Sequence, residues 1–345
     1  MTKRVLITGG TGFLGLHLAR KFVKEKYTVT LFDLENLEEK ALRKKVRFIK
    51  GDIRDQKAIA SAMIGQDYVV HAAAALPVLA DKKIIFSINI DGTKTVLNSA
   101  LKHNIKRVVF ISSTAIYGVP KHLPEMEDSP LSPIGYYGIS KIAGEKLCLS
   151  FQKKGLPVNI LRPTTFLGTE RLGIFELWFE AMHSNKRVFI LGSGNNTYQL
   201  LAVTDFADAI EKALLCKKSG EIFNIGAAEF GTWREDLGYV IKKIHSKSVI
   251  TSLPTLPSQL ILQLLEILHL SPLAAWHYKV LPVDSYTSIE KAKKILGWKP
   301  KKSNKELFLE SYLWYKEHRK EVMHTVGNTH RVGWNFKLLN LVAKL

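Results

Sequence analysis

Cysteine is nearly absent from this sequence of 345 residues, in which Cys148 and Cys216 stand alone. Two distant cysteines exclude a disulfide framework and the close paired spacing of structural zinc sites, so we expect no bound metal. The start, Met-Thr-Lys-Arg, leads directly into a strand pattern and lacks the features of a signal peptide. We therefore expect a protein of a reducing, cytoplasmic compartment.

Long uninterrupted apolar runs are also absent. The most apolar stretch, residues 253–276, is broken by three prolines, by Glu266 and by His269. It falls short of the roughly 20 consecutive apolar residues that a membrane-spanning helix needs. The sequence therefore predicts no transmembrane segment.

Acidic residues are scarce relative to basic ones: 31 Asp and Glu against 50 Lys and Arg give a net charge of +19. Such a charge attracts anions, which include a dinucleotide, a nucleotide-sugar or an anionic membrane surface. No zinc-finger spacing, basic zipper or RNA-recognition signature is present, so we do not expect a nucleic-acid partner. Peripheral contact with an anionic membrane is left open. With 46% hydrophobic and 23% charged residues, the composition is that of a globular protein.

Short apolar runs alternate with helix-length segments through the first half of the chain. Runs rich in Val and Ile, separated in this way, predict parallel strands buried on both faces and joined by crossover helices. The fold class is therefore α/β, with a flavodoxin-like sheet as the alternative to a dinucleotide-binding one. The strands are expected at residues 4–8, 28–33, 46–50, 68–72, 107–112 and 158–162.

The second half of the chain is less regular and predicts a smaller, mostly helical lobe. Residues 1–168 are expected to form the first domain, whose sheet is revisited at about residues 200–226. The segments 169–199 and 227–325 are expected to form the substrate lobe. Residues 326–345 form a tail that mixes basic and apolar side chains, suited to a membrane interface or a partner subunit.

A glycine-rich turn stands where the first strand gives way to a helix. Gly9 permits a tight turn, Gly12 lets the backbone approach a pyrophosphate, and Gly15 lets the helix pack closely on the strand. The helix N-terminus adds N–H donors and partial positive charge. This spacing is a variant of the dinucleotide-binding fingerprint, and its position between strand and helix gives it weight.

An acid at the end of the second strand bears on the choice of dinucleotide. Asp33 is placed to accept hydrogen bonds from a ribose 2′-hydroxyl and to repel a 2′-phosphate, which favours NAD over NADP. The basic cluster at residues 43–45 leaves NADP as the alternative. Asp52, after the third strand, is suited either to the adenine edge or to capping a helix.

Tyr137 and Lys141 are one helical turn apart, so a helix places them on one face. A Tyr pKa near 10 is too high for a base at neutral pH, and a nearby cation is expected to lower it. Lys141, joined by a positively charged nicotinamide ring, is therefore predicted to lower the pKa of Tyr137 and make it the acid/base. A solvated helix face is the alternative for such a pair. His71, at the end of a strand, is expected to be a hydrogen-bonded core residue.

Seven sequence motifs occur in the order of a known family. They are TGGTGFLG, GDIRD, HAAA, NIDGT, FISSTAIYG, YYGISK and LRPTTFLG, across residues 5–168. With them the chain resembles the extended short-chain dehydrogenases/reductases, a group that includes nucleotide-sugar epimerases and dehydratases and the 3β-hydroxysteroid dehydrogenases. The resemblance implies a doubly wound Rossmann sheet, NAD-dependent hydride transfer and a homodimer.

The resemblance also implies roles for particular residues. Ser113 matches the serine four residues before a Tyr-Gly pair and is the catalytic hydroxyl beside Tyr137 and Lys141, with Ser112 and Thr114 as alternatives. Asn89 resembles a residue that braces the site, although an Asn at a helix start is as often a cap. The predicted cofactor-binding residues are Gly9, Thr11, Gly12, Phe13, Leu14, Gly15, Asp33, Asp52, Ile53, Ala72, Ala73, Ala74, Asn89, Ser112, Tyr137, Lys141, Pro163 and Thr164.

The substrate is less clearly indicated. Nucleotide-sugar enzymes of this group place an arginine on the substrate diphosphate, and this chain has Tyr198 at the matching position, so Arg171, Arg187 or Arg234 would have to substitute. The Leu-rich segment 253–282 resembles instead the C-terminal region of the 3β-hydroxysteroid dehydrogenases. An amphipathic helix packed on the core is the plainer explanation of that segment.

Three hypotheses follow. The first is an NAD-dependent dehydrogenase that transfers hydride between NAD and a secondary alcohol or ketone of a rather apolar, steroid- or lipid-like substrate. The second is a nucleotide-sugar epimerase or dehydratase that keeps its NAD bound. The third is a non-catalytic NAD sensor or scaffold, against which Ser113, Tyr137 and Lys141 argue.

Overall fold

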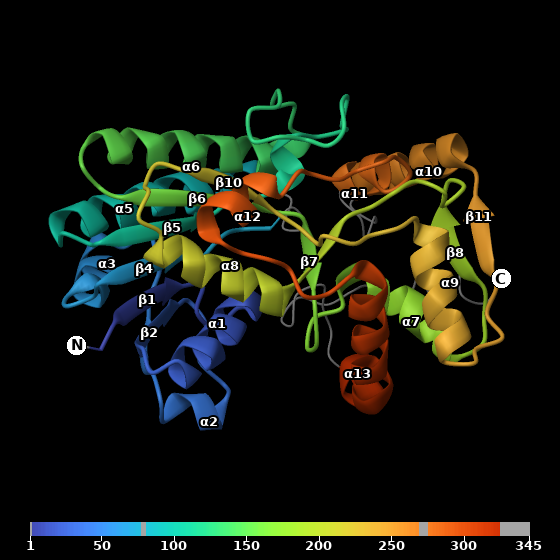
Figure 1. Ribbon diagram of the computed structural model, residues 1–345, viewed down its shortest axis with the longest axis horizontal. Helices are drawn as coiled ribbons and strands as arrows, with labels where there is room; N and C mark the ends of the chain where they lie inside the picture. The colour runs from blue at the N-terminus through green and yellow to red at the C-terminus, as the bar shows by residue number, and fades with distance from the viewer. Residues whose placement is uncertain (1, 77–80, 269–274, 325–345) are drawn as a thin grey trace.

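The computed structural model describes residues 2–76, 81–268 and 275–324. A parallel sheet of seven strands forms the centre of its larger part (Figure 1). An inner strand, β5 (Arg107–Ile111), is buried along its whole length, as expected for a strand covered on both faces. The strands are β1 (Arg4–Thr8), β2 (Thr28–Asp33), β3 (Arg47–Lys50), β4 (Tyr68–His71), β5 (Arg107–Ile111), β6 (Val158–Pro163) and β10 (Ile222–Ile225).

The strand order across the sheet is β3-β2-β1-β4-β5-β6-β10. The chain winds outward from β1 through β2 and β3 and then returns to β4 on the other side of β1. The direction of winding therefore changes between β1 and β4, where a crevice forms at the carboxyl ends of the strands. The predicted doubly wound Rossmann fold is confirmed.

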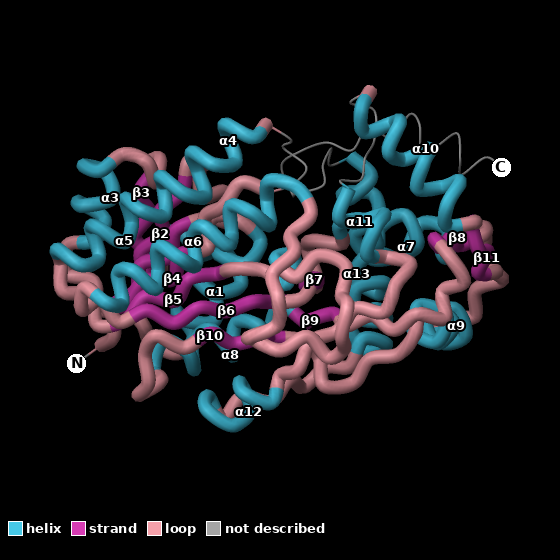
Figure 2. Tube along the Cα trace, turned by 90° about the horizontal axis from the view of Figure 1, so that it is seen from above, coloured by secondary structure: helices cyan, strands magenta, loops and turns pink. Residues whose placement is uncertain are grey.

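Two helical layers cover the sheet, as the two views of Figures 1 and 2 show. Each layer buries an apolar cluster against one face, and the two clusters contain the fully buried Phe22 and Phe32. One layer consists of α3 (Gln56–Met63), α5 (Thr93–Lys102) and α6 (Gly135–Lys153), and the other of α1 (Phe13–Lys24), α8 (Val203–Leu215) and α12 (Glu290–Leu296).

A smaller lobe lies beside the sheet and has an aromatic core. Phe175, Phe179, Trp233 and Phe308 are buried there, with edge-on contacts between Phe308 and both Phe175 and Phe179. Two short parallel pairs complete it, β7 (Thr165–Leu167) with β9 (Leu200–Ala202) and β8 (Val188–Leu191) with β11 (Ile250–Leu253). Its helices are α7 (Glu176–His183), α9 (Trp233–Lys243), α10 (Thr255–Ile267), α11 (Ala275–Val280) and α13 (Asn304–His324).

The predicted strands of the sheet end within one residue of the observed ones, and β10 rejoins the sheet beside β6 as expected. Sequence analysis did not predict β7, β9 and β11, nor the π-helical turn Ser87–Gly92 between α4 (Lys82–Phe86) and α5. Among the described residues, no helix is long and apolar enough to cross a membrane. The tail 326–345 lies outside the described residues.

Candidate active site

A cavity of about 680 Å³ lies at the carboxyl ends of β1 to β6 and reaches the smaller lobe through α11. Its volume is in the range of pockets that hold cofactors and small substrates. All but two of the predicted site residues line it, and the two exceptions are Thr11 and Asn89. The lining residues that were predicted are Gly9, Gly12, Phe13, Leu14, Gly15, Asp33, Asp52, Ile53, Ala72, Ala73, Ala74, Ser112, Ser113, Tyr137, Lys141, Pro163 and Thr164.

The glycine turn depends on the absence of side chains. Gly9 has φ +70°, and a Cβ there would lie 2.8 Å from the backbone nitrogen of Ala73. A Cβ on Gly15 would overlap the carbonyl oxygen of Gly9. Gly12 is the N-cap of α1, and no side chain caps this helix start, so its amides face the cavity side of the turn. The turn can therefore take a pyrophosphate against bare backbone.

Asp33 holds the end of β2 against this turn. Its carboxylate accepts hydrogen bonds from the backbone amides of Thr11, at 2.9 Å, and Glu35, at 3.2 Å. Thr11 is itself buried and meets the site through this backbone contact. The position of Asp33 on the cavity wall agrees with the predicted role on a ribose.

Asp52 also lines the cavity, and Arg54 binds its carboxylate. The backbone amide of Arg54 donates to the same carboxylate at 2.8 Å. This bonding holds the pKa of Asp52 below its ordinary value, mainly through the Arg54 side chain. Ile53 is buried beside it. A carboxylate already engaged in this way is better suited to shaping the adenine side of the cavity than to forming new bonds.

Asn89 lies behind the cavity wall as a brace. Its amide donates to the carbonyl of Ala75 at 3.1 Å and to Ser140 Oγ at 2.9 Å, and its oxygen accepts from the Ala75 amide at 2.7 Å. It therefore ties the segment after β4 to α6. Asn89 does not line the cavity, so the structure does not place it in the predicted contact with a cofactor. His71 is buried between Thr8 and Thr93, with hydrogen bonds of 2.7 Å and 2.9 Å, as expected for a core histidine.

Ser113, Tyr137 and Lys141 come together on one wall of the cavity. The Ser113 side chain follows β5, lies close enough to Tyr137, near the start of α6, to lower its pKa, and accepts a hydrogen bond from the Ala115 amide at 3.1 Å. The Lys141 ammonium lies 5.6 Å from the centre of the Tyr137 ring and donates to the carbonyl of Ile111 at 2.8 Å. Strand end and helix start thus bring together a hydroxyl, a phenol and an ammonium, the three groups that were predicted for proton transfer.

The pKa of Tyr137 shifts in the opposite direction from the prediction. Burial raises it to about 12, while the hydrogen bond from Ser113 and the charge of Arg171 act to lower it. Burial also lowers the pKa of Lys141 to about 8. For the protein without cofactor, the predicted lowering by Lys141 is therefore wrong: burial outweighs the charge of Arg171, and the Lys141 ammonium donates to the backbone carbonyl of Ile111 instead.

Ser112 and Thr114, the alternative hydroxyls, have structural partners. Ser112 Oγ donates to Glu145 at 2.5 Å, and Thr114 Oγ1 donates to the carbonyl of Pro163 at 3.2 Å. Glu145 forms a buried ion pair with Arg162 at 2.7 Å. Sequence analysis did not predict this pair. It holds α6 against the ends of β5 and β6, because breaking a buried ion pair is costly. Ser113 remains the hydroxyl that faces Tyr137.

An arginine from the start of the smaller lobe completes the cavity. Arg171 lies 5.6 Å above the Phe13 ring, and its guanidinium has no hydrogen bond or ion pair with any residue that the structure describes. Arg234, by contrast, donates to the Ser193 carbonyl and to Ser252 Oγ. Of the three arginines named from the sequence, Arg171 is on the cavity wall and Arg187 and Arg234 are not.

The fold and these residues define an NAD-binding enzyme of the extended short-chain dehydrogenase/reductase class. The chain belongs to the NAD dependent epimerase/dehydratase family, whose sequence model matches residues 5–226. A relative from Sinorhizobium fredii, the uncharacterized protein y4nG, is 35% identical, and the alignment covers 99% of this chain and 86% of that protein.

Two solved structures share the fold over most of the chain. The UDP-glucose 4-epimerase of Thermotoga maritima with UDP-glucose has a TM-score of 0.77 at 25% identity, covering 92% of this chain and 99% of that one. The dTDP-glucose 4,6-dehydratase DesIV of Streptomyces venezuelae, a double mutant with NAD bound, has a TM-score of 0.75 at 25% identity, covering 92% and 98%.

The residues present fit NAD, which is the cofactor of this enzyme. The side-chain-free turn at Gly9 and Gly12 leaves room for the pyrophosphate, and Asp33 stands where the ribose is expected. Tyr137 and Lys141 lie farther along the same cavity. One cavity thus contains both the glycine turn and the residues predicted for proton transfer.

Proposed function

We propose that this enzyme oxidises and re-reduces a secondary alcohol of a nucleotide-sugar, as a 4-epimerase-type enzyme does. The observation that carries the proposal is the guanidinium of Arg171, which has no hydrogen bond or ion pair among the described residues and lies in the same cavity as Ser113, Tyr137 and Lys141. Such a cation suits a substrate that carries an anionic group, which a hydroxysteroid without a carboxylate or sulfate lacks. The similarity to enzymes of UDP- and dTDP-sugars supports this choice over the apolar substrate that sequence analysis placed first.

In the proposed mechanism, the glycine turn and Asp33 would hold NAD, which would supply a hydride acceptor and a positive ring charge. Tyr137 takes the hydroxyl proton when the alcohol is oxidised and returns it when the ketone is reduced. Ser113 holds the substrate oxygen through its hydroxyl. Lys141, with its pKa near 8, is largely protonated at neutral pH and stabilises the tyrosinate electrostatically.

Arg171 is assigned to the substrate phosphates. A guanidinium can bind two phosphate oxygens at once, and one that lacks a protein partner has its donors free for them. This assignment replaces the arginine that other nucleotide-sugar enzymes carry at the position of Tyr198. Here Tyr198 is buried and its hydroxyl bonds with Thr165 Oγ1 at 3.0 Å.

The test begins with the purified protein and its content of NAD. We expect bound NAD and interconversion of UDP-glucose and UDP-galactose without net NADH accumulation. The same preparation is then given hydroxysteroids and other lipophilic alcohols. Net NADH formation with these alcohols, and no conversion of UDP- or dTDP-sugars, would overturn the proposal.

The second candidate is the dehydrogenase of an apolar alcohol. It is favoured by Trp276 on the cavity wall and by α10, on which Leu256, Leu260 and Ile261 are each at least 60% exposed. The same apolar helix suits peripheral contact with an anionic membrane, which vesicle sedimentation would test. A homodimer is expected as well, and light scattering would give its mass.

A further inference from the structure

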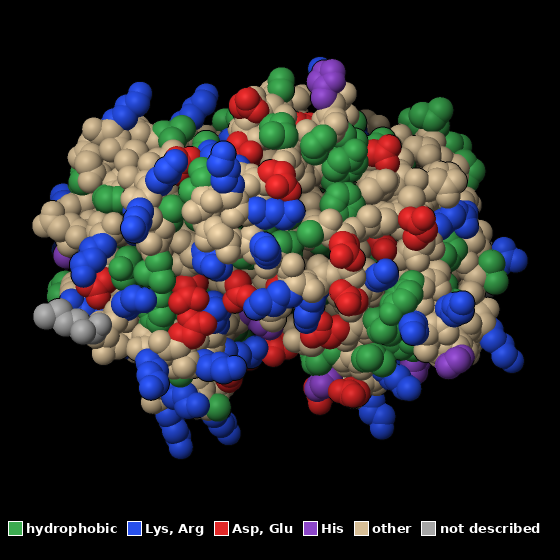
Figure 3. Space-filling view, viewed as in Figure 1, with side chains coloured by type: hydrophobic (Ala, Val, Ile, Leu, Met, Phe, Trp, Pro, Cys, Tyr) green, Lys and Arg blue, Asp and Glu red, His purple; other side chains and the backbone are tan. Residues whose placement is uncertain are grey.

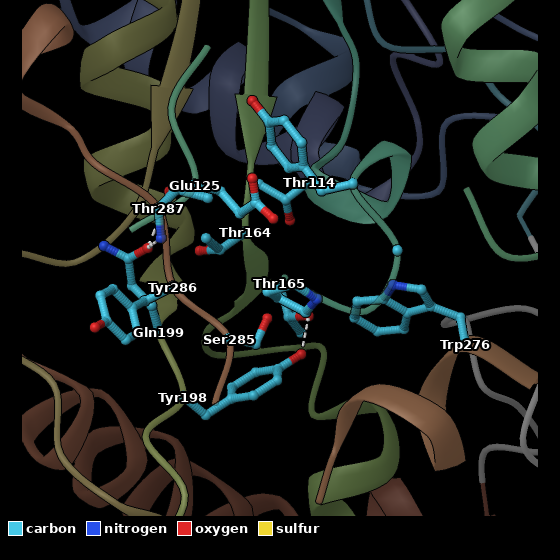
Figure 4. Close-up of a pocket in the computed structure, with 13 residues that line it drawn as sticks. Thr114, Glu125, Thr164, Thr165, Tyr198, Gln199, Trp276, Ser285, Tyr286 and Thr287 are labelled. Carbon is cyan, nitrogen blue, oxygen red and sulfur yellow. Dashed lines mark hydrogen bonds between the residues drawn. The ribbon is translucent and has the colours of Figure 1, made fainter. Parts of the chain in front are cut away.

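The direction of the Arg171 side chain decides how the cavity meets an anion. Among the described residues that line the cavity, only Lys141 and Arg171 are basic, and the Lys141 ammonium donates to a backbone carbonyl. A small recess beside the cavity, which shares Thr165 and Trp276 with it, has no basic residue in its described lining. Figure 4 shows Tyr198 hydrogen-bonded to Thr165 there. Arg171 is therefore the cation whose position matters for an anionic substrate.

The turn at residues 168–171, which carries Arg171, is tight and has a strained backbone. The Arg171 amide donates to the Gly168 carbonyl at 3.3 Å, and Glu170 between them has φ +79°. A side chain rarely adopts this left-handed conformation, which persists only where surrounding contacts hold it. The conformation at Glu170 sets the direction in which Arg171 leaves the turn. The contacts that hold Glu170 therefore also place the Arg171 guanidinium.

Helix α1 supplies these contacts. Phe13, His17 and Arg20 are four and three residues apart, so they lie on one face of the helix. Arg20 Nη1 donates to both carboxylate oxygens of Glu170, at 2.8 Å and 3.0 Å, and His17 Nε2 lies 3.9 Å from the same carboxylate. The Phe13 ring lies 5.6 Å from the Arg171 guanidinium. One face of the cofactor helix thus holds two successive residues of the turn.

Arg20 also separates two neighbouring charges. The carboxylate of Glu170 is bound to α1, and no ion pair joins it to Arg171 in the described part of the chain. Opposite charges on adjacent residues attract each other, so a released Glu170 carboxylate would compete with a phosphate for the Arg171 guanidinium. Nε and Nη2 of Arg20 are occupied by Glu39, which holds the guanidinium in place, with the shortest bond at 2.7 Å.

We propose that Arg20 is a positioning residue for substrate binding: by holding Glu170 on α1, it keeps the Arg171 guanidinium aimed into the cavity and free for the substrate phosphates. This inference rests on the proposed function, because that function assigns the phosphates to Arg171. Arg20 itself does not line the cavity. It acts on the substrate through Glu170 and the turn.

The test compares wild type with Arg20→Gln, Glu170→Gln and the double variant, each saturated with NAD and titrated calorimetrically with UDP. Arg20→Gln should lose UDP affinity by about tenfold, the factor of one charge-assisted hydrogen bond. Glu170→Gln removes the competing charge together with the ion pair, so its loss should be about threefold or less. The double variant should match Glu170→Gln, which means that the second change suppresses the first.

The matched control is Glu39→Gln, which removes the other carboxylate on the same guanidinium. The Glu39 and Glu170 side chains are similarly exposed, at 29% and 39%. Glu39→Gln should bind UDP as wild type does. In assays with UDP-glucose, Arg20→Gln should raise KM by about the factor lost in UDP affinity, with kcat and NAD affinity little changed. Arg20→Lys, a milder variant, should show a smaller loss in the same direction because an ammonium lacks the planar fork.

Arg171→Gln separates the two levels of the argument, and it should lose UDP affinity by about 10- to 100-fold. Wild type that binds neither UDP nor dTDP, or Arg171→Gln that binds UDP at wild-type strength, overturns the proposed function and this inference together. A loss with Arg171→Gln but none with Arg20→Gln or Arg20→Lys overturns the inference alone. A loss with Arg20→Gln that Glu170→Gln does not suppress, or that extends equally to NAD, indicates a structural role and also overturns it.

Discussion

At Tyr137, burial and charge act on the phenol in opposite directions. The nearby Ser113 hydroxyl and the charge of Arg171 act to lower the pKa of Tyr137, yet burial raises it to about 12. A base with this pKa is almost fully protonated at neutral pH. The positive ring of bound NAD is the additional charge that the site requires, so proton transfer should depend on the oxidised cofactor.

Replacing Tyr137 by Phe should lower kcat by a factor of about 10² to 10⁴, because the group that moves the proton is lost. NAD binding, measured by fluorescence titration, should change little. Tyr239→Phe on α9, remote from the cavity, is the matched control and should keep full activity. A Tyr137→Phe enzyme that retained most of the wild-type rate would refute the assigned role.

Asp33 is expected to set the choice between NAD and NADP. Replacing it by Ala removes the charge that repels a 2′-phosphate, so the preference for NAD should fall by about tenfold or more. Titration of both cofactors gives this ratio directly, and Asp128→Asn should leave it unchanged. Equal affinity of the unmodified protein for NAD and NADP would contradict the argument.

His71 should make the fold sensitive to acid. Burial, aided by the charge of Lys141, lowers its pKa from 6.5 to about 3. Between pH 6.5 and about pH 3, the imidazole is protonated in the unfolded chain and neutral in the folded one. The free energy of unfolding therefore decreases as the pH is lowered, by up to about 1.4 kcal/mol per pH unit. Urea unfolding at about pH 7 and about pH 5 should show a smaller loss for His71→Asn than for wild type. The exposed His122, changed to Gln, serves as the control, and equal losses in all three proteins would disprove the effect.

At the scale of elements, the turn between β1 and α1 packs closely on the helix and also leaves backbone amides uncovered by side chains. Gly15 on α1 touches the turn so closely that any side chain collides with Gly9. The same contact that packs the helix on the strand aims its amides at the cavity. Stability and cofactor binding therefore depend on one turn.

Gly15→Ala should abolish NAD binding and destabilise the protein, because the turn must open to admit the methyl group. Gly238 on α9 is the matched control: a Cβ there meets nothing within 4 Å. Gly238→Ala should leave binding intact and stabilise the fold by about 0.4–1 kcal/mol, since Ala suits a helix better. Calorimetric titration with NAD and urea unfolding measure the two effects, and NAD binding by Gly15→Ala at wild-type strength would refute the packing argument.

On the scale of the whole molecule, charged side chains are spread over the surface, and the cavity lies between the sheet and the smaller lobe. Figure 3 shows Lys and Arg side chains spread over the visible face among Asp and Glu, and pairs such as Lys21 with Glu211 at 2.9 Å link helices. The cavity is lined by both the sheet and the smaller lobe, through Gly9 and Trp276 among others. Ligands should therefore stabilise the two parts together.

NAD at about 100 times its dissociation constant should raise the free energy of unfolding by about 2.7 kcal/mol. The urea midpoint, followed with and without NAD, measures this shift. NADP at the same concentration should give a smaller one, because Asp33 disfavours it. An unchanged midpoint with NAD would contradict binding to the folded protein.

Local features were predictable from the sequence because their causes are local. The period of apolar residues marked the strands, and the spacing of Gly9, Gly12 and Gly15 marked the turn. Tyr137 and Lys141 were recognisable because helical geometry relates neighbouring residues in a fixed way. Thr165 and Trp276 carried no such signal, since they are far apart in sequence and line one cavity only in the folded chain.

The sequence by itself determined the Rossmann sheet and the glycine turn and put Tyr137 and Lys141 on one helix face, because each rests on short-range periodicity or spacing. Only the tertiary structure decided which arginine faces the cavity, which hydroxyl faces Tyr137 and in which direction the pKa of Tyr137 moves. Those properties depend on burial and on contacts between distant segments. Burial removes water from a charged or polar group, and a linear sequence does not specify how much water remains.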